Sequence, residues 1–196
     1  MPTILLLDVM ETLVTEPYYR AMPGFFGMSL EELQAAKHPT SWIEFEKGQL
    51  AEAEYLPRFF RDKRPVDGEG LRRCVMDAFD WLDGMETLLA ELHAAGHEMH
   101  ALSNYPIWYE MIEEKLQLSR YLQWSFVSCH TGVRKPDPQA YLGAAKSLRV
   151  APRDCLFIDD RLRNVQAAQA VGMDVIHRQS GEQLRDELVR RRLLSS

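Results

Sequence analysis

Four short apolar runs in the sequence are each followed by polar residues that could do chemistry. They are Asp8 after the first run, Ser103 and Asn104 after the second, Arg134 and Lys135 beyond the third, and Asp159 and Asp160 after the fourth. Carboxylates are hard oxygen ligands suited to Mg²⁺, which also takes water and phosphate oxygens. A lysine ammonium and a serine hydroxyl can bind a phosphoryl group as its charge develops. Brought together by the fold, these residues would bind a divalent cation and a phosphoryl group.

The elements that carry these residues are predicted to form a parallel sheet. The apolar runs span residues 3–7, 98–102, 124–128 and 155–158, with a weaker run at 174–177. Helical patterns occupy residues 84–95, 107–118, 138–148 and 162–171. Strands that alternate with helices of this length favour βαβ crossovers. Because ligands bind at the carboxyl ends of parallel strands, where the strand order reverses, we expect the polar residues to share one crevice.

The segment from residue 14 to residue 83 is of a different kind. It is rich in aromatic residues and has no strand pattern, and Ser29 and Glu32 have the spacing of a capping box. Helices are expected at residues 30–37, 40–47, 51–61 and 69–79. The segment is therefore predicted to be a helical insertion after the first strand.

The motifs at the strand ends resemble those of the haloacid dehalogenase-like (HAD) hydrolase superfamily. ILLLDVMETLV resembles its first motif, HALSN the second, RKPDP the lysine motif and CLFIDDRLRNVQAAQAVGM the fourth, in the same order and spacing. The resemblance implies an α/β Rossmann-like core of residues 1–13 and 84–196, a parallel sheet of order 5-4-1-2-3, and a helical C1 cap at residues 14–83. DVMETLV, FFGMS, KHPTSWIEFEKG and SNYPIWY are in turn similar to plant chloroplast flavin mononucleotide (FMN) hydrolases of this superfamily.

Carried over to this chain, the resemblance implies a Mg²⁺-dependent phosphomonoester hydrolase that acts on a small phosphorylated metabolite, with FMN as a candidate. Asp8 would attack phosphorus and form an aspartyl-phosphate intermediate. Ser103 and Lys135 would bind the transferring phosphoryl group. Asn104 would orient the loop or the substrate.

The same resemblance implies a cation site. Its ligands would be Asp8, the backbone carbonyl of Met10, Asp159 and Asp160. Clustered carboxylates repel one another, so the Mg²⁺ and Lys135 are both electrostatically required. Arg161 and Asn164 follow the acidic pair and would tune this site, although Asn164 could equally start the next helix.

Position 10 departs from the phosphatase pattern. Met10 stands where the pattern has a second Asp, the general acid for the leaving alcohol and base for water, whose help is worth about 10²–10⁴-fold. Glu11 is the nearest substitute, and a good leaving group or a metal-bound water would lessen the need. Two other functions therefore stay open. One is a dehalogenase-type hydrolase in which Asp8 attacks carbon, and the other is a non-catalytic ligand-binding protein.

Candidate substrate contacts lie in the helical insertion. We expect them at His38, Trp42, Glu44 and Arg58, because a C1 cap closes over the crevice and an aromatic wall suits stacking on a flat ring. The alternative is that the aromatic residues of the insertion form the core of the cap itself. That set is Trp42, Phe45, Phe59 and Phe60.

The composition narrows the function further. The 196 residues carry a net charge of −6, which argues against a protein that tracks nucleic-acid phosphates. No apolar run approaches the roughly 20 residues needed to cross a bilayer. Three cysteines without metal-ligand spacing indicate reduced thiols in a protein of the cytosol or of an organelle interior, and we predict a cytoplasmic location. We predict no nucleic-acid partner, no membrane partner and no particular oligomeric state.

Overall fold

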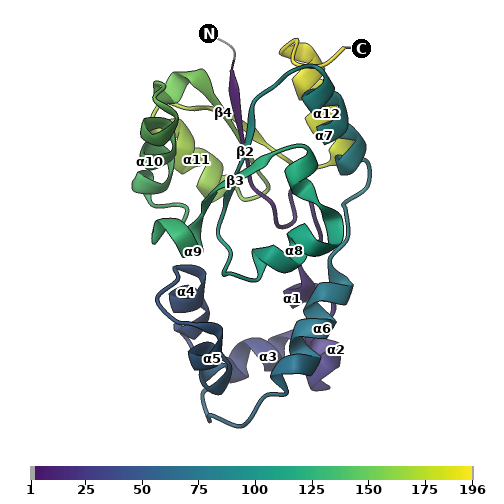
Figure 1. Ribbon diagram of the computed structural model, residues 1–196, viewed down its shortest axis with the longest axis vertical. Helices are drawn as coiled ribbons and strands as arrows, with labels where there is room; N and C mark the ends of the chain where they lie inside the picture. Colours follow the sequence, from purple (N-terminus) through teal and green to yellow (C-terminus); the bar gives the residue numbers. More distant parts are fainter. Residues whose placement is uncertain (1–2, 196) are drawn as a thin grey trace.

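A five-stranded parallel sheet forms the centre of the chain in the computed structural model, which describes residues 3–195. Its strands are β1 (Ile4–Leu7), β2 (Met99–Ser103), β3 (Gln123–Val127), β4 (Cys155–Asp159) and β5 (Asp174–His177). The order is β3-β2-β1-β4-β5 (Figure 1). This confirms the predicted α/β fold and strand order, counted from the opposite edge. Residues 1–2 and 196, which the sequence assigned to the core, lie outside the described residues.

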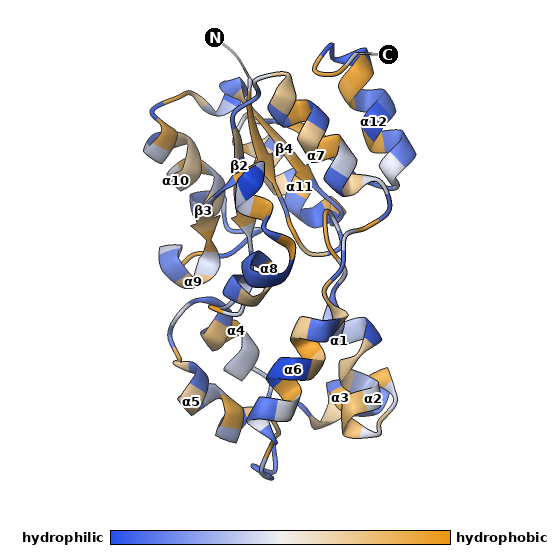
Figure 2. Cartoon of the chain, turned by 45° about the vertical axis from the view of Figure 1, so that its right-hand side comes forward, coloured by the Kyte–Doolittle hydropathy of each residue, from blue (hydrophilic) through white to orange (hydrophobic). Residues whose placement is uncertain are grey.

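Alternate residues of β1 enter two different apolar layers. Leu5 and Leu7 belong to a cluster that includes residues of α7 (Met85–Ala94), α8 (Tyr109–Leu116) and α12 (Gly181–Arg190). Ile4 and Leu6 belong to a second cluster with residues of α10 (Pro138–Leu148) and α11 (Leu162–Ala170). Figure 2 shows the apolar strands between these helices. A sheet covered on both faces explains why the strands read as continuous apolar runs rather than as alternating ones.

Local signals place the helices of the sheet region close to their predicted bounds. The Asp137 side chain accepts from the backbone N–H of Gln139 and caps α10, whose first residue is Pro138. The helix α9 (Ser128–Thr131) and the 3₁₀ turns η2 (Leu118–Arg120) and η3 (Pro152–Asp154) were not predicted. Each is a single turn, too short to leave a periodic pattern.

Six helices form a separate group between β1 and α7, named here the helical unit (residues 17–78; Figure 1). They are α1 (Pro17–Arg20), α2 (Met22–Phe26), α3 (Leu30–Ala36), α4 (Ser41–Glu46), α5 (Glu52–Tyr55) and α6 (Gly68–Ala78), with the 3₁₀ turn η1 (Leu56–Arg58) after α5. The capping box is confirmed, because Ser29 and Glu32 bond each other's backbone N–H. The helix predicted at 51–61 is instead α5 followed by η1, since Pro57 cannot donate an α-helical hydrogen bond.

The two segments that join the helical unit to the sheet are paired with each other. The backbone N–H of Thr15 donates to Asp80 O at 2.9 Å, and that of Leu82 donates to Leu13 O at 2.9 Å. The Thr15 hydroxyl also donates to Ala78 O at 2.7 Å. The helical unit therefore enters and leaves the sheet region at one point, which suits a hinge.

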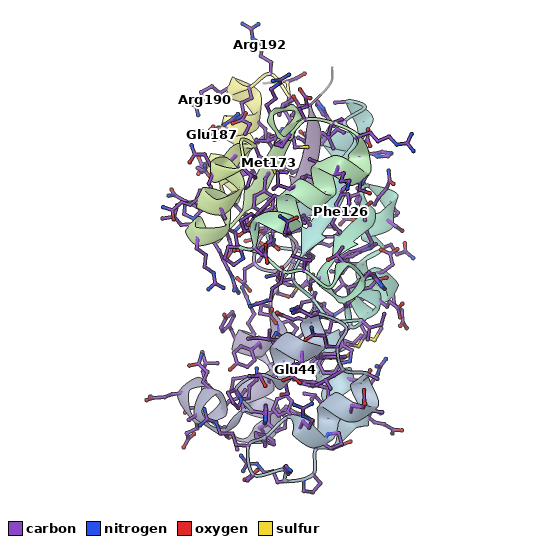
Figure 3. The ribbon with its side chains drawn as sticks, turned by 90° about the vertical axis from the view of Figure 1, so that its left-hand side faces the viewer. Glu44, Phe126, Met173, Glu187, Arg190 and Arg192 are labelled. Atoms are coloured by element: carbon purple, nitrogen blue, oxygen red, sulfur yellow. The ribbon has the colours of Figure 1, made fainter. Side chains whose placement is uncertain are left out.

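The carboxyl ends of the strands face the helical unit. The basic residues Arg190 to Arg192, near the C-terminus, lie at the far end of the molecule. Figure 3 shows Glu187, Arg190 and Arg192 at that far end, with Phe126 and Met173 nearer the sheet and Glu44 in the helical unit. The Arg190 side chain is largely exposed, whereas Arg191 is partly buried and pairs with Asp174 and Glu187. No helix in residues 3–195 has both the length and the apolarity that crossing a bilayer requires.

Candidate active site

Three carboxylates meet at the carboxyl ends of β1 and β4. One oxygen each from Asp8, Asp159 and Asp160 can be chosen so that all lie within 4.8 Å of one another. The strands β1 and β4 are neighbours at the point where the strand order reverses, so the two strand ends meet as the sequence predicted. The cluster consists of hard oxygen donors, the type that Mg²⁺ prefers.

Lys135 joins two of these carboxylates from within the protein. Its Nζ lies 2.7 Å from Asp8 Oδ1 and 2.7 Å from Asp159 Oδ2, and its side chain is only 1% exposed. Burial lowers the pKa of Lys135, but the two carboxylates raise it above its ordinary value. Lys135 therefore stays protonated and neutralises part of the acidic cluster.

The two acidic residues at the end of β4 differ in how many hydrogen bonds their side chains already accept. Asp159 is fully buried, and besides Lys135 it accepts from Asn164 Nδ2 and, at 2.7 Å, from the backbone N–H of Arg161. Asn164 therefore orients Asp159 and does not start the helix. Asp160 is less buried, and Thr12 Oγ1 lies 3.4 Å from its Oδ1. Asp160 is thus the member free to face a cation.

The polar residues Ser103 and Asn104, at the carboxyl end of β2, have two different environments. The Asn104 amide forms a reciprocal pair with the Lys135 backbone, donating to its carbonyl and accepting from its N–H, each at 2.8 Å. Asn104 therefore holds the loop that carries the lysine. The Ser103 hydroxyl is buried, at 2% exposure, and has no hydrogen-bond partner among the described residues. An unpaired buried hydroxyl is costly unless a ligand completes it.

The electrostatics of the cluster favour a bound cation. Burial raises the pKa of Asp8 to about 7, and the charges of Asp159 and Asp160 add to this rise while Lys135 opposes it. Burial and Asp159 likewise raise the pKa of Asp160. One ammonium thus faces three carboxylates, and a divalent cation would relieve the remaining repulsion.

A small polar cavity of about 40 Å³ lies beside Asp8. It is lined by Asp8, Met10, Asn104, Lys135 and Asn164, together with Arg134, Arg161 and, from the helical unit, Glu46. Since a cavity needs roughly 10–15 Å³ for each water, this volume holds a few waters and is far too small for a fused ring system. The helical unit is therefore closed over the site in this structure.

The predicted contacts in the helical unit do not line this cavity. Within residues 3–195, the His38 ring accepts from the backbone N–H of Thr40 and Ser41 at the start of α4, and Arg58 pairs with Glu44 at 2.9 Å. Trp42 does not line the cavity itself but contacts a residue that does, because its Nε1 donates to Glu46 Oε1. Substrate contacts by His38, Trp42, Glu44 and Arg58 stay predictions, which apply to an arrangement in which the helical unit has moved away from the sheet.

Most aromatic residues of the helical unit form its interior. Phe45, Phe59 and Phe60 are buried in one apolar cluster, the alternative raised from the sequence. Trp42 packs edge-on against Trp108, which follows β2, so the helical unit is in contact with the sheet region. Trp108, too, is buried in this contact and does not line the cavity.

Glu46 and Thr12 were not among the predicted site residues, and Arg134 was named with Lys135 but given no role of its own. Thr12 could have been found, since it lies in the first motif, with its hydroxyl 3.2 Å from Asp8 Oδ2. Glu46 carried no sequence signal, because its position depends on how the helical unit folds over the sheet.

Comparisons with known proteins agree with this architecture. A family model described as haloacid dehalogenase-like hydrolase matches residues 6–172. Flavin mononucleotide hydrolase 1 of Arabidopsis thaliana, named as chloroplastic, is 49% identical over 185 residues, which span 94% of this chain and 76% of that protein. Sesquiterpene phosphatase astK of Aspergillus oryzae is 27% identical over 76% of this chain and 78% of its own length.

A solved structure supports the fold. A HAD family enzyme of Bacteroides thetaiotaomicron superposes with a TM-score of 0.78 over 95% of this chain and 98% of that chain, at 18% identity. Such a low identity carries the fold and no detail of the reaction. The family match covers most of the chain and includes Asp8, Asp159 and Asp160. The chain belongs to the haloacid dehalogenase-like hydrolases.

Proposed function

We propose that this hydrolase is a Mg²⁺-dependent phosphomonoesterase that works through an aspartyl-phosphate on Asp8. The observation that carries the proposal is the buried Lys135 ammonium, 2.7 Å from both Asp8 and Asp159, beside the third carboxylate of Asp160. A lone strand-end carboxylate would be weak support. A carboxylate trio, a fixed ammonium and an unpaired buried hydroxyl on Ser103 together match the needs of phosphoryl transfer.

Each group has a distinct part in this proposal. Asp8 attacks phosphorus, and Lys135 holds the Asp8 carboxylate in place while offering its charge to the phosphoryl oxygens. The Ser103 hydroxyl donates to a phosphoryl oxygen and so gains the partner that it lacks. Asn104 keeps the lysine loop in position.

The residues present fit a magnesium ion. Asp8, Asp160 and the backbone carbonyl of Met10 would hold it, and Asp159 would support the site through Lys135 and Asn164. When bound, the ion neutralises charge on the phosphoryl oxygens and on the attacking carboxylate.

The substrate in this proposal is a small phosphorylated metabolite, and FMN is the first one to test. Support comes from the Arabidopsis relative, which is named as an FMN hydrolase and shares 49% identity. Residues 14–83 act as the cap, and the paired linkers at Thr15 and Asp80 form its hinge. Because the closed cavity holds only about 40 Å³, the cap has to move away for a flavin to enter.

Phosphate release from FMN and a panel of other phosphomonoesters, with Mg²⁺ and then with EDTA, tests the proposal. We expect Mg²⁺-dependent release that Asp8→Asn abolishes, whereas Asp62→Asn, a surface carboxylate of the helical unit, leaves the rate unchanged. Release of halide from a 2-haloacid instead would assign the dehalogenase reaction. Binding of FMN without any turnover would assign the non-catalytic alternative.

The cellular compartment stays a prediction. The three cysteines are free, which accords with a reducing interior such as the cytoplasm. The Arabidopsis relative is named as chloroplastic, so a plastid location is the alternative. Fractionation of the source cells would decide between them.

A further inference from the structure

The proposed reaction lacks an obvious proton donor for the leaving group. Met10 lines the catalytic cavity but has no titratable group. The nearest substitute by sequence, Glu11, does not line the cavity within the described chain. Its carboxylate accepts from the backbone N–H of Glu16 at 2.7 Å and faces Arg20 at 3.5 Å. The acid and base therefore have to come from another element.

Glu46 of α4 is the carboxylate outside the acidic cluster that lines the same cavity as Asp8. Its residue is 6% exposed. Trp42 Nε1 donates to Oε1 at 2.5 Å, and the Ser128 hydroxyl donates to the Glu46 backbone carbonyl at 2.6 Å, which ties α4 to the sheet region. The other oxygen, Oε2, lies 2.9 Å from Arg134 Nη2 but has no aligned hydrogen bond in the described structure. Glu46 Oε2 is thus a buried oxygen of a cavity-lining residue, and no hydrogen bond is aligned to it in the described structure.

The position of Glu46 suits the line of attack. Asp8 lies at the carboxyl end of β1, whereas α4 lies across from the strand ends, on the side of the helical unit (Figure 1). In phosphoryl transfer the attacking and leaving oxygens lie roughly in line through phosphorus. A leaving oxygen displaced by Asp8 therefore points away from the sheet and toward the helical unit.

The groups around Glu46 poise it for proton transfer. Burial raises its pKa, while Arg134, Trp42 and Arg161 oppose the rise. The remaining charged groups that face it are Glu16, at the first linker, and Lys37, after α3. Because of its raised pKa, a larger fraction of this carboxyl is protonated near neutral pH than of an ordinary glutamate, so more of it has a proton to donate.

We propose that Glu46, supplied by the helical unit, is the general acid and base that position 10 lacks. This inference rests on the proposed phosphomonoesterase reaction. An Asp8 oxygen bonds to phosphorus while the bond from phosphorus to the leaving oxygen breaks, with its electron pair staying on that oxygen. The Glu46 proton moves to the leaving oxygen and yields the alcohol. The Glu46 carboxylate then takes a proton from water as the water oxygen bonds to phosphorus and the bond to Asp8 breaks, which releases phosphate.

The test compares leaving groups of different basicity in wild type and Glu46→Gln. An alkyl phosphate such as FMN needs a proton on its leaving oxygen, whereas p-nitrophenyl phosphate releases a stable anion. We expect Glu46→Gln to lower kcat/KM by about 10²–10⁴-fold for the alkyl ester and by less than about tenfold for the aryl ester. Adding Met10→Asp to Glu46→Gln should restore at least tenfold of the alkyl activity.

A matched control and a second variant keep the test decisive. Glu52→Gln also alters a glutamate between the helical unit and the sheet region, since Glu52 accepts from Trp108 Nε1 at 2.9 Å, but it lies outside the cavity. It should leave the leaving-group dependence unchanged. If Glu46→Gln does not fold, Glu46→Asp replaces it. This variant keeps a carboxyl but withdraws it from the leaving oxygen, and it should lower kcat/KM more for the alkyl ester than for the aryl ester.

The outcomes separate the two proposals. Equal losses on both esters, or no rescue by Met10→Asp, overturn the role of Glu46 while the phosphatase reaction stands. Both proposals are overturned if the wild type shows no Mg²⁺-dependent release of phosphate, or if Asp8→Asn does not abolish that release.

Discussion

The two walls of the polar cavity beside Asp8 are built in different ways. On the sheet side, Lys135 and Asp159 each contact several fixed partners, and Asn104 holds the lysine loop from a neighbouring strand end. On the side of the helical unit, Glu46 has one hydrogen bond to its side chain, from Trp42, and an unaligned ion pair with Arg134.

This difference fits two tasks. The proposed nucleophile and cation ligands need fixed geometry, because small displacements of reacting groups are costly. The wall that admits the substrate has to move, and Glu46 Oε2 has no aligned hydrogen bond in the described structure that such movement would break. Variants on each side should therefore fail in different ways, and the following predictions run from the largest expected effect to the smallest.

Lys135→Met should produce the largest loss. It leaves Asp8 and Asp159 buried beside each other without their shared cation. Breaking such an arrangement typically costs about 3–5 kcal/mol of unfolding free energy, and loss of one transition-state contact costs about 10²–10³-fold in kcat. Urea unfolding in EDTA and phosphate release measure the two effects.

The control for this variant is Lys146→Met, on an exposed face of α10, which should change neither quantity appreciably. Added Mg²⁺ should recover part of the stability of Lys135→Met, since it replaces the missing positive charge. Near-wild-type stability of Lys135→Met in EDTA would show that the contacts of Lys135 with Asp8 and Asp159 do not hold the sheet side rigid.

Glu16→Gln should stabilise the protein at high pH. Burial raises the pKa of Glu16 from 4.5 to about 7, so the folded state holds a proton that the unfolded state releases. Stability is therefore lost as the pH rises from about 4.5 to 7. The amide cannot ionise, and the unfolding free energy at pH 8 should rise by up to about 3 kcal/mol, with little change at pH 4.

Urea unfolding at both pH values measures this effect. The Glu16 carboxylate accepts from the backbone N–H of Tyr18 at the start of α1, and the amide oxygen of glutamine can keep that bond. An equal change at both pH values would mean that the variant acts through packing and not through ionisation.

Gly48→Ala should loosen the closed arrangement. Gly48 has a φ of +67°, and a Cβ there would collide with the carbonyl oxygen of Cys129 in α9. Gly27 has nearly the same φ, +62°, with no atom within 4 Å of a Cβ. Both alanines carry the cost of a left-handed conformation, about 1 kcal/mol, but only Gly48→Ala pushes the helical unit from the sheet region.

The comparison of the two alanine variants isolates closure. We expect Gly48→Ala to lower kcat for phosphate release several-fold more than Gly27→Ala does, with the larger loss of unfolding free energy as well. Indistinguishable kcat values would show that close packing at Cys129 is unimportant for catalysis.

Glu11→Gln should have the smallest effect. Its carboxylate bonds a backbone N–H outside the cavity, and an amide oxygen can accept the same bond. We expect less than about a threefold change in kcat/KM for alkyl and aryl phosphates alike. A hundredfold loss confined to alkyl phosphates would transfer the acid and base role from Glu46 to Glu11.

The sheet and the chemistry of its strand ends could be predicted because both are local in the sequence. Apolar runs bounded by capping signals, such as Asp137 before Pro138, locate strands and helices, and a parallel sheet then brings Asp8 and Asp159 to one edge. The helical unit was predicted less completely. Its short helices α1 and α2 are four and five residues long, too short for a periodic pattern.

The sequence by itself determined which residues form the sheet side of the site, because apolar runs and the polar residues that end them are properties of contiguous segments. Only the tertiary structure decided what faces them. Glu46 lies 38 residues after Asp8 and shares no element with it, so their common cavity depends on the paired linkers and on the packing of Trp42 against Trp108. Such long-range contacts follow from the complementary shapes of two folded parts, which no local pattern encodes.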